Sequence, residues 1–313
     1  MSEMKHVALL GAGAVGAYLI LHLTGAKDVD FAVVAEGERA ERLKKQGITI
    51  NGTAYFPQIK APSELEEVDL LVIALKYAGL KNSLEEIRAC VHENTTVMSL
   101  MNGIDSEEII AQQVGVDKVI RSVIRIASVR TADDILFDDE GTLGITFGEY
   151  RNAKDVAEYK PSERLLAIKT LFDNHKIASE IKAQEETDEW VKFQHNVTYN
   201  LPQAILGTGY GAYFDSEHVA FIRDALDAEL RAIASANGID LPVTKQDKYD
   251  FVQDKARYST LQDIDNKRHT EVDMFAGALI KKGREAGIPT PNLELVLHMI
   301  HALEEKNDGK FEY

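Results

Sequence analysis

The chain has 313 residues and a formal net charge of −16 at pH 7, and 45 % of its residues are hydrophobic. The length predicts two domains, and the composition is typical of a globular protein. The acidic balance argues against nucleic acids and anionic membrane surfaces as partners. The single cysteine, Cys90, excludes an internal disulfide and a thiolate metal cluster. We expect neither a signal peptide nor a membrane span, and therefore a cytoplasmic protein.

The first part of the chain alternates apolar runs with stretches of helical pattern. The runs predict strands at residues 6–10, 29–35, 68–75, 96–100, 118–127, 141–148 and 176–181. Helices are expected at residues 17–23, 37–46, 80–90, 107–114 and 162–174. Such alternation is typical of βαβ units that build a parallel sheet, and an uninterrupted apolar run is typical of a strand covered on both faces.

From about residue 182 the pattern changes to helices with few strand candidates. Helices are expected at residues 216–236, 270–286 and 293–306. We place the boundary near Ile181, so that residues 1–181 form an α/β domain and residues 182–313 form an all-helical domain.

Glycines at positions 11, 13 and 16 directly follow the first predicted strand and open the first helix. In this context they form the dinucleotide-binding fingerprint, which combines a tight turn, a close approach of backbone N–H groups to a pyrophosphate, and close helix–strand packing. The helix N-terminus adds a partial positive charge. The alternative is a tight turn without a ligand. We predict that residues 1–181 form a Rossmann-like doubly wound sheet, whose nucleotide is held by Gly11, Ala12, Gly13, Ala14, Val15 and Gly16.

The residue at the end of the second strand commonly separates NAD from NADP. An acid there binds the ribose 2′-hydroxyl and repels a 2′-phosphate, whereas an arginine does the reverse. Glu36 occupies this position, and Arg39 and Arg42 lie nearby, one helical turn apart. These residues favour NADH and leave NADPH open.

A polar stripe lies on the helix predicted around residues 190–205. Lys192, Asn196 and Asn200 recur at steps of four and therefore share one face, beside apolar neighbours. Buried polar groups need partners, so the stripe indicates a cleft that binds a ligand. Alternatively, both asparagines cap or bridge neighbouring backbone and the lysine reaches water. Pro202 predicts that the helix kinks or restarts just after Asn200.

With these features, the segments STLQDI at residues 259–264 and RHTEVD at 268–273 make the chain resemble the ketopantoate reductases (2-dehydropantoate 2-reductases). The NG turn at residues 102–103 and the segment GIPTP at 287–291 match as well, so the resemblance covers nearly the whole chain. It implies NADP(H) as the cofactor. NAD(H) is the alternative, because Glu36 stands where the family commonly has arginine.

The resemblance implies that Lys192 is the general acid, which protonates the substrate carbonyl oxygen as hydride arrives from the nicotinamide. It assigns substrate binding to Asn196, Asn200 and Ser259. The chemistry agrees with the lysine's role, because hydride delivery to a ketone builds negative charge on oxygen, which an ammonium stabilises. Ser259 is equally open to interpretation as an ordinary N-cap or loop hydroxyl.

By the same resemblance, Glu271 is a catalytic acid that helps to hold substrate and cofactor, Asn102 contacts both at their junction, and Lys76 is a cofactor-side lysine. The alternative for Glu271 is structural, because Thr270 and Asp273 form a capping-box-like helix start and an acid in the first turn is stabilised there. Asn102 could likewise be only a turn residue.

Four further side chains remain to be placed. Tyr210 falls roughly where some family members have another substrate-binding asparagine, and Tyr210 and Tyr213 either pack or line the mouth of the substrate site. His195 and His269 are expected at the surface or behind the groups that contact substrate. The His, Asp and Glu spacing indicates no metal site, so none is expected.

We therefore expect an NAD(P)H-dependent oxidoreductase that reduces a 2-oxo acid to a 2-hydroxy acid in the cleft between the two domains. The first substrate choice is ketopantoate, reduced to pantoate in pantothenate biosynthesis. The alternative is an NAD-dependent D-2-hydroxyacid dehydrogenase acting on branched or aromatic 2-oxo acids, to which Glu36 and Tyr210 point. A non-catalytic nucleotide sensor is a third hypothesis, which Lys192 disfavours. The expected partners are the small-molecule substrate and a second copy in a homodimer, without nucleic acid or membrane.

Overall fold

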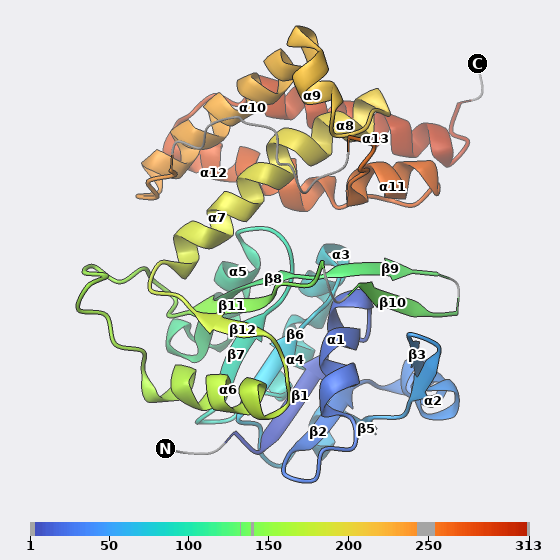
Figure 1. Cartoon of the computed structure of the whole chain (residues 1–313), viewed down its shortest axis with the longest axis vertical. Helices are drawn as coiled ribbons and strands as arrows, with labels where there is room; N and C mark the ends of the chain where they lie inside the picture. Colours follow the sequence, from blue (N-terminus) through green and yellow to red (C-terminus); the bar gives the residue numbers. More distant parts are fainter. Residues whose placement is uncertain (1–3, 132, 139–140, 243–253, 312–313) are drawn as a thin grey trace. The chain divides into compact units, whose positions relative to one another are not determined.

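The computed structural model describes residues 4–131, 133–138, 141–242 and 254–311. The chain divides into two compact units (Figure 1). Unit 1 contains the chain up to Asn102 together with Ser106–Asp188, and unit 2 contains Gly103–Asp105 together with the chain from Glu189 onward. The division falls inside helix α7 (Glu185–His195).

Unit 1 is built on an eight-stranded sheet with the strand order β12-β11-β8-β7-β6-β1-β2-β5. The neighbours from β8 to β5 pair in parallel. The seven strands expected from the apolar runs are confirmed, with small differences at their ends, and β5 is an eighth strand that was not predicted. The strands of this sheet are β1 (His6–Leu10), β2 (Asp30–Val34), β5 (Gln58–Lys60), β6 (Leu70–Ile73), β7 (Thr96–Ser99), β8 (Val119–Arg125), β11 (Gly144–Gly148) and β12 (Ser179–Ile181).

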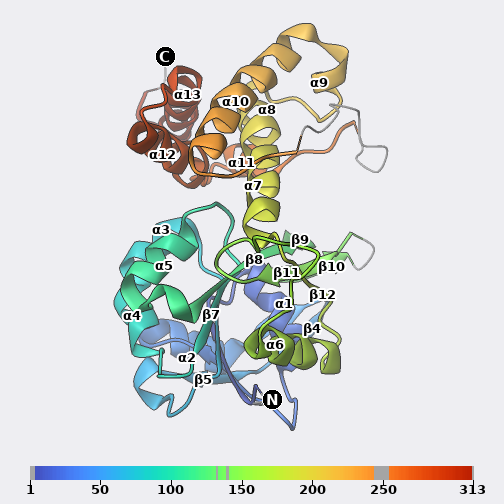
Figure 2. The same cartoon turned by 90° about the vertical axis from the view of Figure 1, so that its left-hand side faces the viewer.

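Helices cover both faces of this sheet, as a doubly wound fold requires. Strand residues alternate between two cores: Leu9 packs in one core with Ile20 of α1, whereas Leu10 packs in the other with Ile87 of α4. Figure 2 shows α1 and α6 on one side of the sheet and α4 and α5 on the other. The helices are α1 (Ala14–Leu23), α2 (Gly37–Gln46), α3 (Tyr77–Leu80), α4 (Leu84–Ala89), α5 (Ser106–Val114) and α6 (Glu163–Asn174).

The sheet departs from the predicted parallel arrangement at one edge. Strand β11 pairs antiparallel with β8, and β12 pairs parallel with β11. A parallel neighbour needs a long crossover, usually a helix, but β8 and β11 are joined through the hairpin of β9 (Ala127–Arg130) and β10 (Ile135–Asp138). These two strands form a second, four-stranded sheet with β3 (Ile48–Ile50) and β4 (Thr53–Tyr55), which sequence patterns did not predict.

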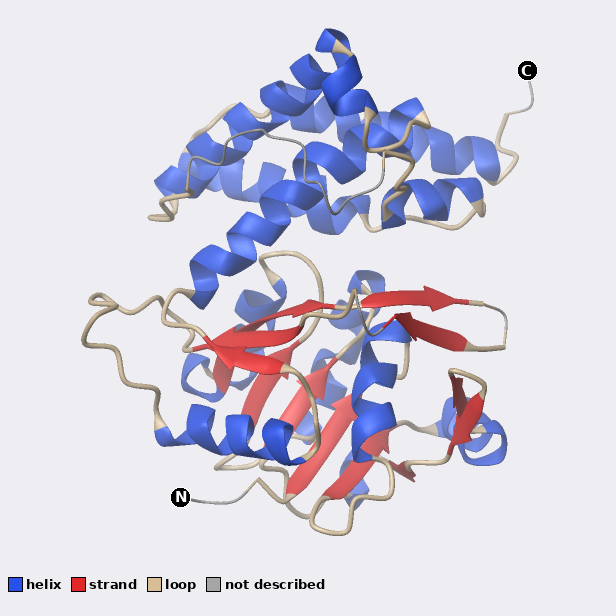
Figure 3. Ribbon diagram, viewed as in Figure 1, coloured by secondary structure: helices blue, strands red, loops and turns tan. Residues whose placement is uncertain are grey.

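Unit 2 is helical, as predicted, and Figure 3 shows only helices and loops in the part of this unit that the structure describes. Two of its segments are π-helical, η4 (Asn196–Asn200) and η5 (Asp273–Gly277). The others are α7, α8 (Leu201–Leu206), α9 (Ala212–Asp215), α10 (Glu217–Ala236), α11 (Ser259–Asp265), α12 (Ala278–Ala286) and α13 (Pro291–Asn307). Among the described helices of the chain, none combines the length and apolar character needed to cross a membrane.

Candidate active site

In the glycine loop of unit 1 the fold requires glycine at two positions, Gly11 and Gly16, but not at Gly13. Gly11 has φ +115°, and a Cβ on it would lie 2.3 Å from the carbonyl oxygen of Ala74. A Cβ on Gly16 would lie 1.9 Å from the carbonyl oxygen of Gly11, whereas one on Gly13 would meet no atom within 4 Å. Packing alone therefore accounts for Gly11 and Gly16. At Gly13 the open space is what a closely approaching phosphate requires.

The start of α1 has the chemistry of an anion site. Gly13 is its N-cap, no side chain caps the free N–H groups, and the first turn contains no acidic residue. The partial positive charge of the helix end is therefore uncompensated by the helix itself. These features fit the pyrophosphate of a dinucleotide.

The remaining nucleotide candidates follow neighbouring parallel strands. Lys76 comes three residues after β6, and Asn102 three residues after β7. Glu36 comes two residues after β2, where it is the exposed N-cap of α2. Because β2, β1, β6 and β7 are adjacent and parallel, their carboxyl ends share one edge of the sheet, the edge at which open α/β sheets bind ligands. The fold thus gathers these candidates with the glycine loop.

A cavity of about 550 Å³ lies beside Glu36 in unit 1. Three segments form its walls: the end of β2 with the first turn of α2, the turn at residues 62–63, and α4. The lining residues are Ala35, Glu36, Arg39, Pro62, Ser63, Glu86 and Ala89.

In unit 2 one continuous helical path carries the polar stripe. Lys192 lies on α7, half-buried, and Asn196 and Asn200 begin and end η4. The α-helix restarts at Leu201, as predicted from Pro202, which has no N–H for an α-helical bond. In an α-helix four residues turn through more than a full circle, so side chains spaced four apart move gradually around the helix axis. A π-helix has more residues per turn, so the same spacing turns through slightly less than a circle. The π segment therefore partly restores Asn200 to the direction of Lys192.

The structure brings Asn200 and Ser259 into direct contact. The Nδ2 of Asn200 donates to the hydroxyl of Ser259 over 3.2 Å, and its Oδ1 accepts from the backbone N–H of Thr260 over 3.1 Å. Asn200 is 3 % exposed. The backbone-bridging interpretation of this asparagine is therefore confirmed, and the same contact fixes the start of α11. Ser259 is the first residue of that helix, after the N-cap Tyr258.

Gln203 is a buried polar residue of this region that sequence reasoning missed. Its Oε1 accepts from the backbone N–H of Tyr258 over 2.5 Å, and its Nε2 donates to the carbonyl oxygen of Ala256 over 3.0 Å. Its position, one helical turn after Asn200, was the available signal. Asn200 and Gln203 together attach residues 256–260 to the continuous helical path that carries Lys192.

Glu271 lies at the turn that leads into η5, and its carbonyl oxygen accepts from the N–H of Met274 over 3.0 Å. The predicted capping box is wrong: the Thr270 hydroxyl accepts from the N–H of Val272 over 3.2 Å, and the Asp273 carboxylate instead contacts His301. The element that follows Glu271 packs on the stripe helix, because Phe275 of η5 contacts Phe193 of α7 with ring centroids 6.1 Å apart.

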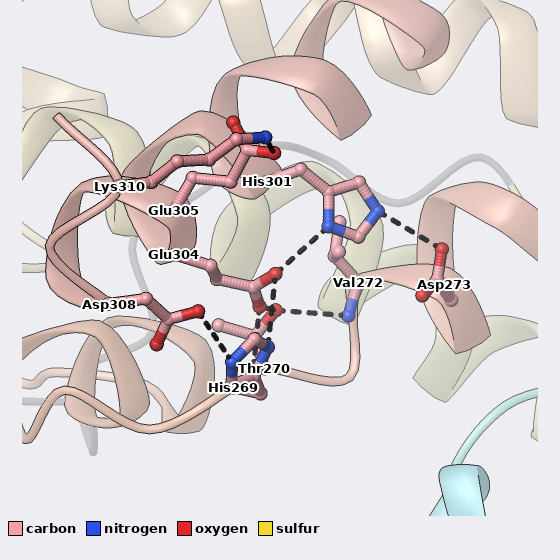
Figure 4. A network of polar contacts seen from close by, with 9 residues as sticks. All are labelled: His269, Thr270, Val272, Asp273, His301, Glu304, Glu305, Asp308 and Lys310. Atoms are coloured by element: carbon pink, nitrogen blue, oxygen red, sulfur yellow. Dashed lines mark hydrogen bonds and ion pairs between the residues drawn. The ribbon is translucent and has the colours of Figure 1, made fainter.

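A buried carboxylate anchors this turn (Figure 4). The Oε1 of Glu304 accepts from the backbone N–H of Thr270 over 2.6 Å and from its hydroxyl over 2.7 Å. Its Oε2 lies 2.9 Å from Nδ1 of His301, whose Nε2 lies 3.2 Å from Asp273. Burial raises the pKa of Glu304, but Thr270 and His301 outweigh it and hold this pKa below its ordinary value. Burial lowers the pKa of His301, but Glu304 and Asp273 hold it above its ordinary value.

The aromatic residues near the stripe are packing residues. Tyr210 and Tyr213 are 0 % and 1 % exposed, and the Tyr213 hydroxyl donates to the carbonyl oxygen of Tyr199, so of the two interpretations packing is correct. His195 stacks on Tyr199 with ring centroids 4.7 Å apart, and burial lowers its pKa to about 4, which keeps it neutral at pH 7. His269 is exposed and pairs with Asp308 at 3.1 Å.

Within the described residues, no group of three or more His, Cys, Asp or Glu side chains is arranged to hold a metal ion.

A doubly wound sheet with this glycine loop, joined to a helical unit with a lysine and amide stripe, defines the class of dinucleotide-dependent oxidoreductases. A family model described as "Ketopantoate reductase PanE/ApbA" matches residues 7–152, and its C-terminal counterpart matches residues 186–304. The chain belongs to the ketopantoate reductase family and is an oxidoreductase of the 2-dehydropantoate 2-reductase type, acting on CH–OH groups with NAD(P). Reduction of a 2-oxo acid is the activity that this family supports.

Three similar proteins illustrate the relationship. A 2-dehydropantoate 2-reductase of Mesorhizobium japonicum is 25 % identical, over 95 % of this chain and 97 % of its own. The crystal structure of a PanE/ApbA family ketopantoate reductase from Ralstonia eutropha JMP134 matches with TM-score 0.78 and 20 % identity, over 97 % of this chain and 100 % of that one. A D-mandelate dehydrogenase with NADH and anilino(oxo)acetate matches with TM-score 0.77 and 21 % identity, over the same shares.

Proposed function

We propose that the protein reduces ketopantoate (2-dehydropantoate) to pantoate in pantothenate biosynthesis, with Lys192 as the proton donor. The observation that carries the proposal is the direct Asn200–Ser259 contact on the helix of Lys192, because it ties two substrate-binding candidates to the element that holds the candidate acid. The packing of η5 on the same helix brings the segment that follows Glu271 to that element.

In this proposal a bound reduced nicotinamide nucleotide supplies the hydride, and residues of the chain bind the nucleotide and the substrate and donate the proton. The loop around Gly13 and the start of α1 bind the pyrophosphate, while Lys76 and Asn102 contact the cofactor from the same sheet edge. Lys192 stabilises the negative charge that develops on the carbonyl oxygen and donates the proton.

The substrate is held by hydrogen-bond donors of unit 2. Asn196 contributes an amide, and Ser259 contributes a hydroxyl whose position Asn200 sets. Glu271 accepts a hydrogen bond from substrate or cofactor. Asn200 thus acts through Ser259, since both ends of its amide already have protein partners.

The test is the substitution Lys192→Ala, with Lys281→Ala as the control because Lys281 is an exposed lysine of the same unit that pairs with Glu285. General acid help is worth about 10²–10⁴-fold, so we expect kcat to fall at least a hundredfold while NADH or NADPH still binds. Unchanged turnover would remove Lys192 from this role.

The second candidate function is an NAD-dependent D-2-hydroxyacid dehydrogenase, which Glu36 and the similarity to the NADH-bound D-mandelate dehydrogenase favour. A panel of ketopantoate and branched or aromatic 2-oxo acids, assayed with both cofactors, separates the two candidates. Absence of cofactor oxidation with every acid would favour the nucleotide sensor. The family resemblance favours NADP(H) as the cofactor, whereas Glu36 favours NAD(H), and Glu36→Arg should shift the preference towards NADPH. The homodimer and the cytoplasmic location stay predictions, the former to be checked by sedimentation.

A further inference from the structure

The cavity beside Glu36 contains a second carboxylate that the proposed function leaves unassigned. Three of its lining residues are charged: Glu36 and Arg39 from the start of α2, and Glu86 from α4. Ala35, Pro62 and Ala89 supply apolar surface, and Ser63 supplies a hydroxyl. This combination suits the adenosine part of a nucleotide, which presents a flat apolar ring and ribose hydroxyls.

We propose that Glu86 is a specificity-determining residue, which acts with Glu36 to make this cavity accept a ribose with a free 2′-hydroxyl and reject a 2′-phosphate. The proposal rests on the proposed function, because it requires that the protein binds a nicotinamide dinucleotide. It goes further by placing part of the discrimination on Glu86 of α4, in addition to Glu36 at the end of the second strand.

Charge within the cavity supports this role. With Glu36 and Arg39 alone, the acid and the guanidinium would balance, and the guanidinium would be available to a 2′-phosphate. Glu86 makes the sum of the three charges negative and pairs electrostatically with Arg39. A 2′-phosphate, with almost two negative charges, would then enter a site of the same sign, whereas a hydroxyl can donate to either carboxylate.

The electrostatic coupling of these groups is visible in two neighbouring pKa values. Burial raises the pKa of the Glu86 carboxyl, Arg39 opposes this shift, and the charge of Glu36 adds to it. Burial also raises the pKa of the Cys90 thiol to about 12, and Glu86 and Glu36 add to that shift. At Glu86 the effect of Arg39 is larger than that of Glu36, whereas at Cys90 both carboxylates contribute, so the charges of Glu36, Arg39 and Glu86 act on one region.

The test compares Glu86→Gln with Glu85→Gln as a matched control. Glu85 precedes Glu86 on α4, and Glu85→Gln changes the charge of the protein by the same amount. Glu85 does not line the cavity, and its Oε1 instead accepts a hydrogen bond from the Nε2 of Gln113 on α5. Glu86→Gln should not impair folding, because glutamine keeps the shape of the side chain and its capacity for hydrogen bonds. The probes are NADH and NADPH, titrated against each protein by fluorescence, and ADP and its 2′-phosphorylated form as fragments.

We expect the wild-type protein to bind NADH more tightly than NADPH. A unit charge several ångströms from a doubly charged phosphate in water-like surroundings changes affinity by about threefold to tenfold, so Glu86→Gln should tighten NADPH by about that factor and change NADH less than twofold. Glu36→Gln/Glu86→Gln should shift the ratio further, and Glu85→Gln should leave it unchanged.

The outcomes separate the two proposals. A wild-type protein that binds neither dinucleotide would overturn the proposed function and this inference together. Binding with an NADH-to-NADPH ratio that Glu86→Gln leaves unchanged, or an equal shift with Glu85→Gln, would overturn the role of Glu86 alone and leave the reductase proposal intact.

Discussion

The substitution Glu304→Gln tests how the turn that carries Glu271 is held in place. Glu304 is 5 % exposed and accepts two hydrogen bonds from Thr270 and one from His301. Hydrogen bonds to a charged group contribute about 1.5–3 kcal/mol each. Glutamine keeps the shape and an acceptor for Thr270 but loses the charge, so we expect a loss of about 2 kcal/mol. Alanine strands all three donors and should cost about 3–5 kcal/mol.

Urea unfolding monitored by tryptophan fluorescence measures this loss of stability in unit 2, the structural unit that contains Glu304. The chain has a single tryptophan, Trp190, which is 3 % exposed and belongs to unit 2, so its emission reports the unit that contains Glu304. The control is Glu305→Gln, which removes the neighbouring carboxylate from a solvent-exposed pair with Lys310. Such a pair contributes about 0–1 kcal/mol, so the control should stay close to wild type.

The pH dependence makes the prediction sharper. The pKa of Glu304 is lowered from 4.5, so its contribution is fully present above pH 4.5 and is lost as the pH falls through the folded value. The pKa of His301 is raised from 6.5, so its contribution is fully present below pH 6.5 and is lost as the pH rises through the folded value. The difference between wild type and Glu304→Gln should therefore be largest between pH 4.5 and 6.5. A difference below about 0.5 kcal/mol, or one that is constant from acid to alkaline pH, would refute the network as an anchor.

Three further substitutions test the glycine loop and the Asn200 contact. Gly16→Ala should destabilise unit 1 by several kcal/mol, because its Cβ would lie 1.9 Å from a backbone oxygen, and thermal unfolding measures this loss. The Cβ of Gly13→Ala meets no atom within 4 Å, so this variant should keep its stability while its NADH affinity, measured by titration, falls at least tenfold. A Gly13→Ala protein that binds NADH normally would contradict the pyrophosphate role. Asn200→Ala should cost about 2–3 kcal/mol, because it leaves a buried N–H of α11 without its acceptor; urea unfolding followed by Trp190 emission measures it, and a loss below ~0.5 kcal/mol would contradict the bridging role of Asn200.

Local chemistry made much of unit 1 predictable. The glycine spacing after the strand His6–Leu10 marks a tight turn, in which Gly11 adopts a positive φ and Gly16 packs against the carbonyl oxygen of Gly11. Strands covered on both faces are recognisable as uninterrupted apolar runs, because each side chain is buried whichever way it points. The second sheet escaped prediction because its strands are short and partly exposed: in β4, Thr53 and Ala54 face solvent, so no apolar pattern marks them.

Of the candidate site, the sequence by itself determined that Lys192, Asn196 and Asn200 share a helix face, since four-residue spacing along a helix needs nothing but the helix. Only the tertiary structure decided which hydrogen-bond partners these side chains have within the protein, because the partner of Asn200 is Ser259, fifty-nine positions away. The turn that carries Glu271 is likewise anchored through Thr270 by a carboxylate thirty-four positions after that threonine, at Glu304. A hydrogen bond between segments so far apart depends on how whole helices pack, and no local pattern of residues encodes that.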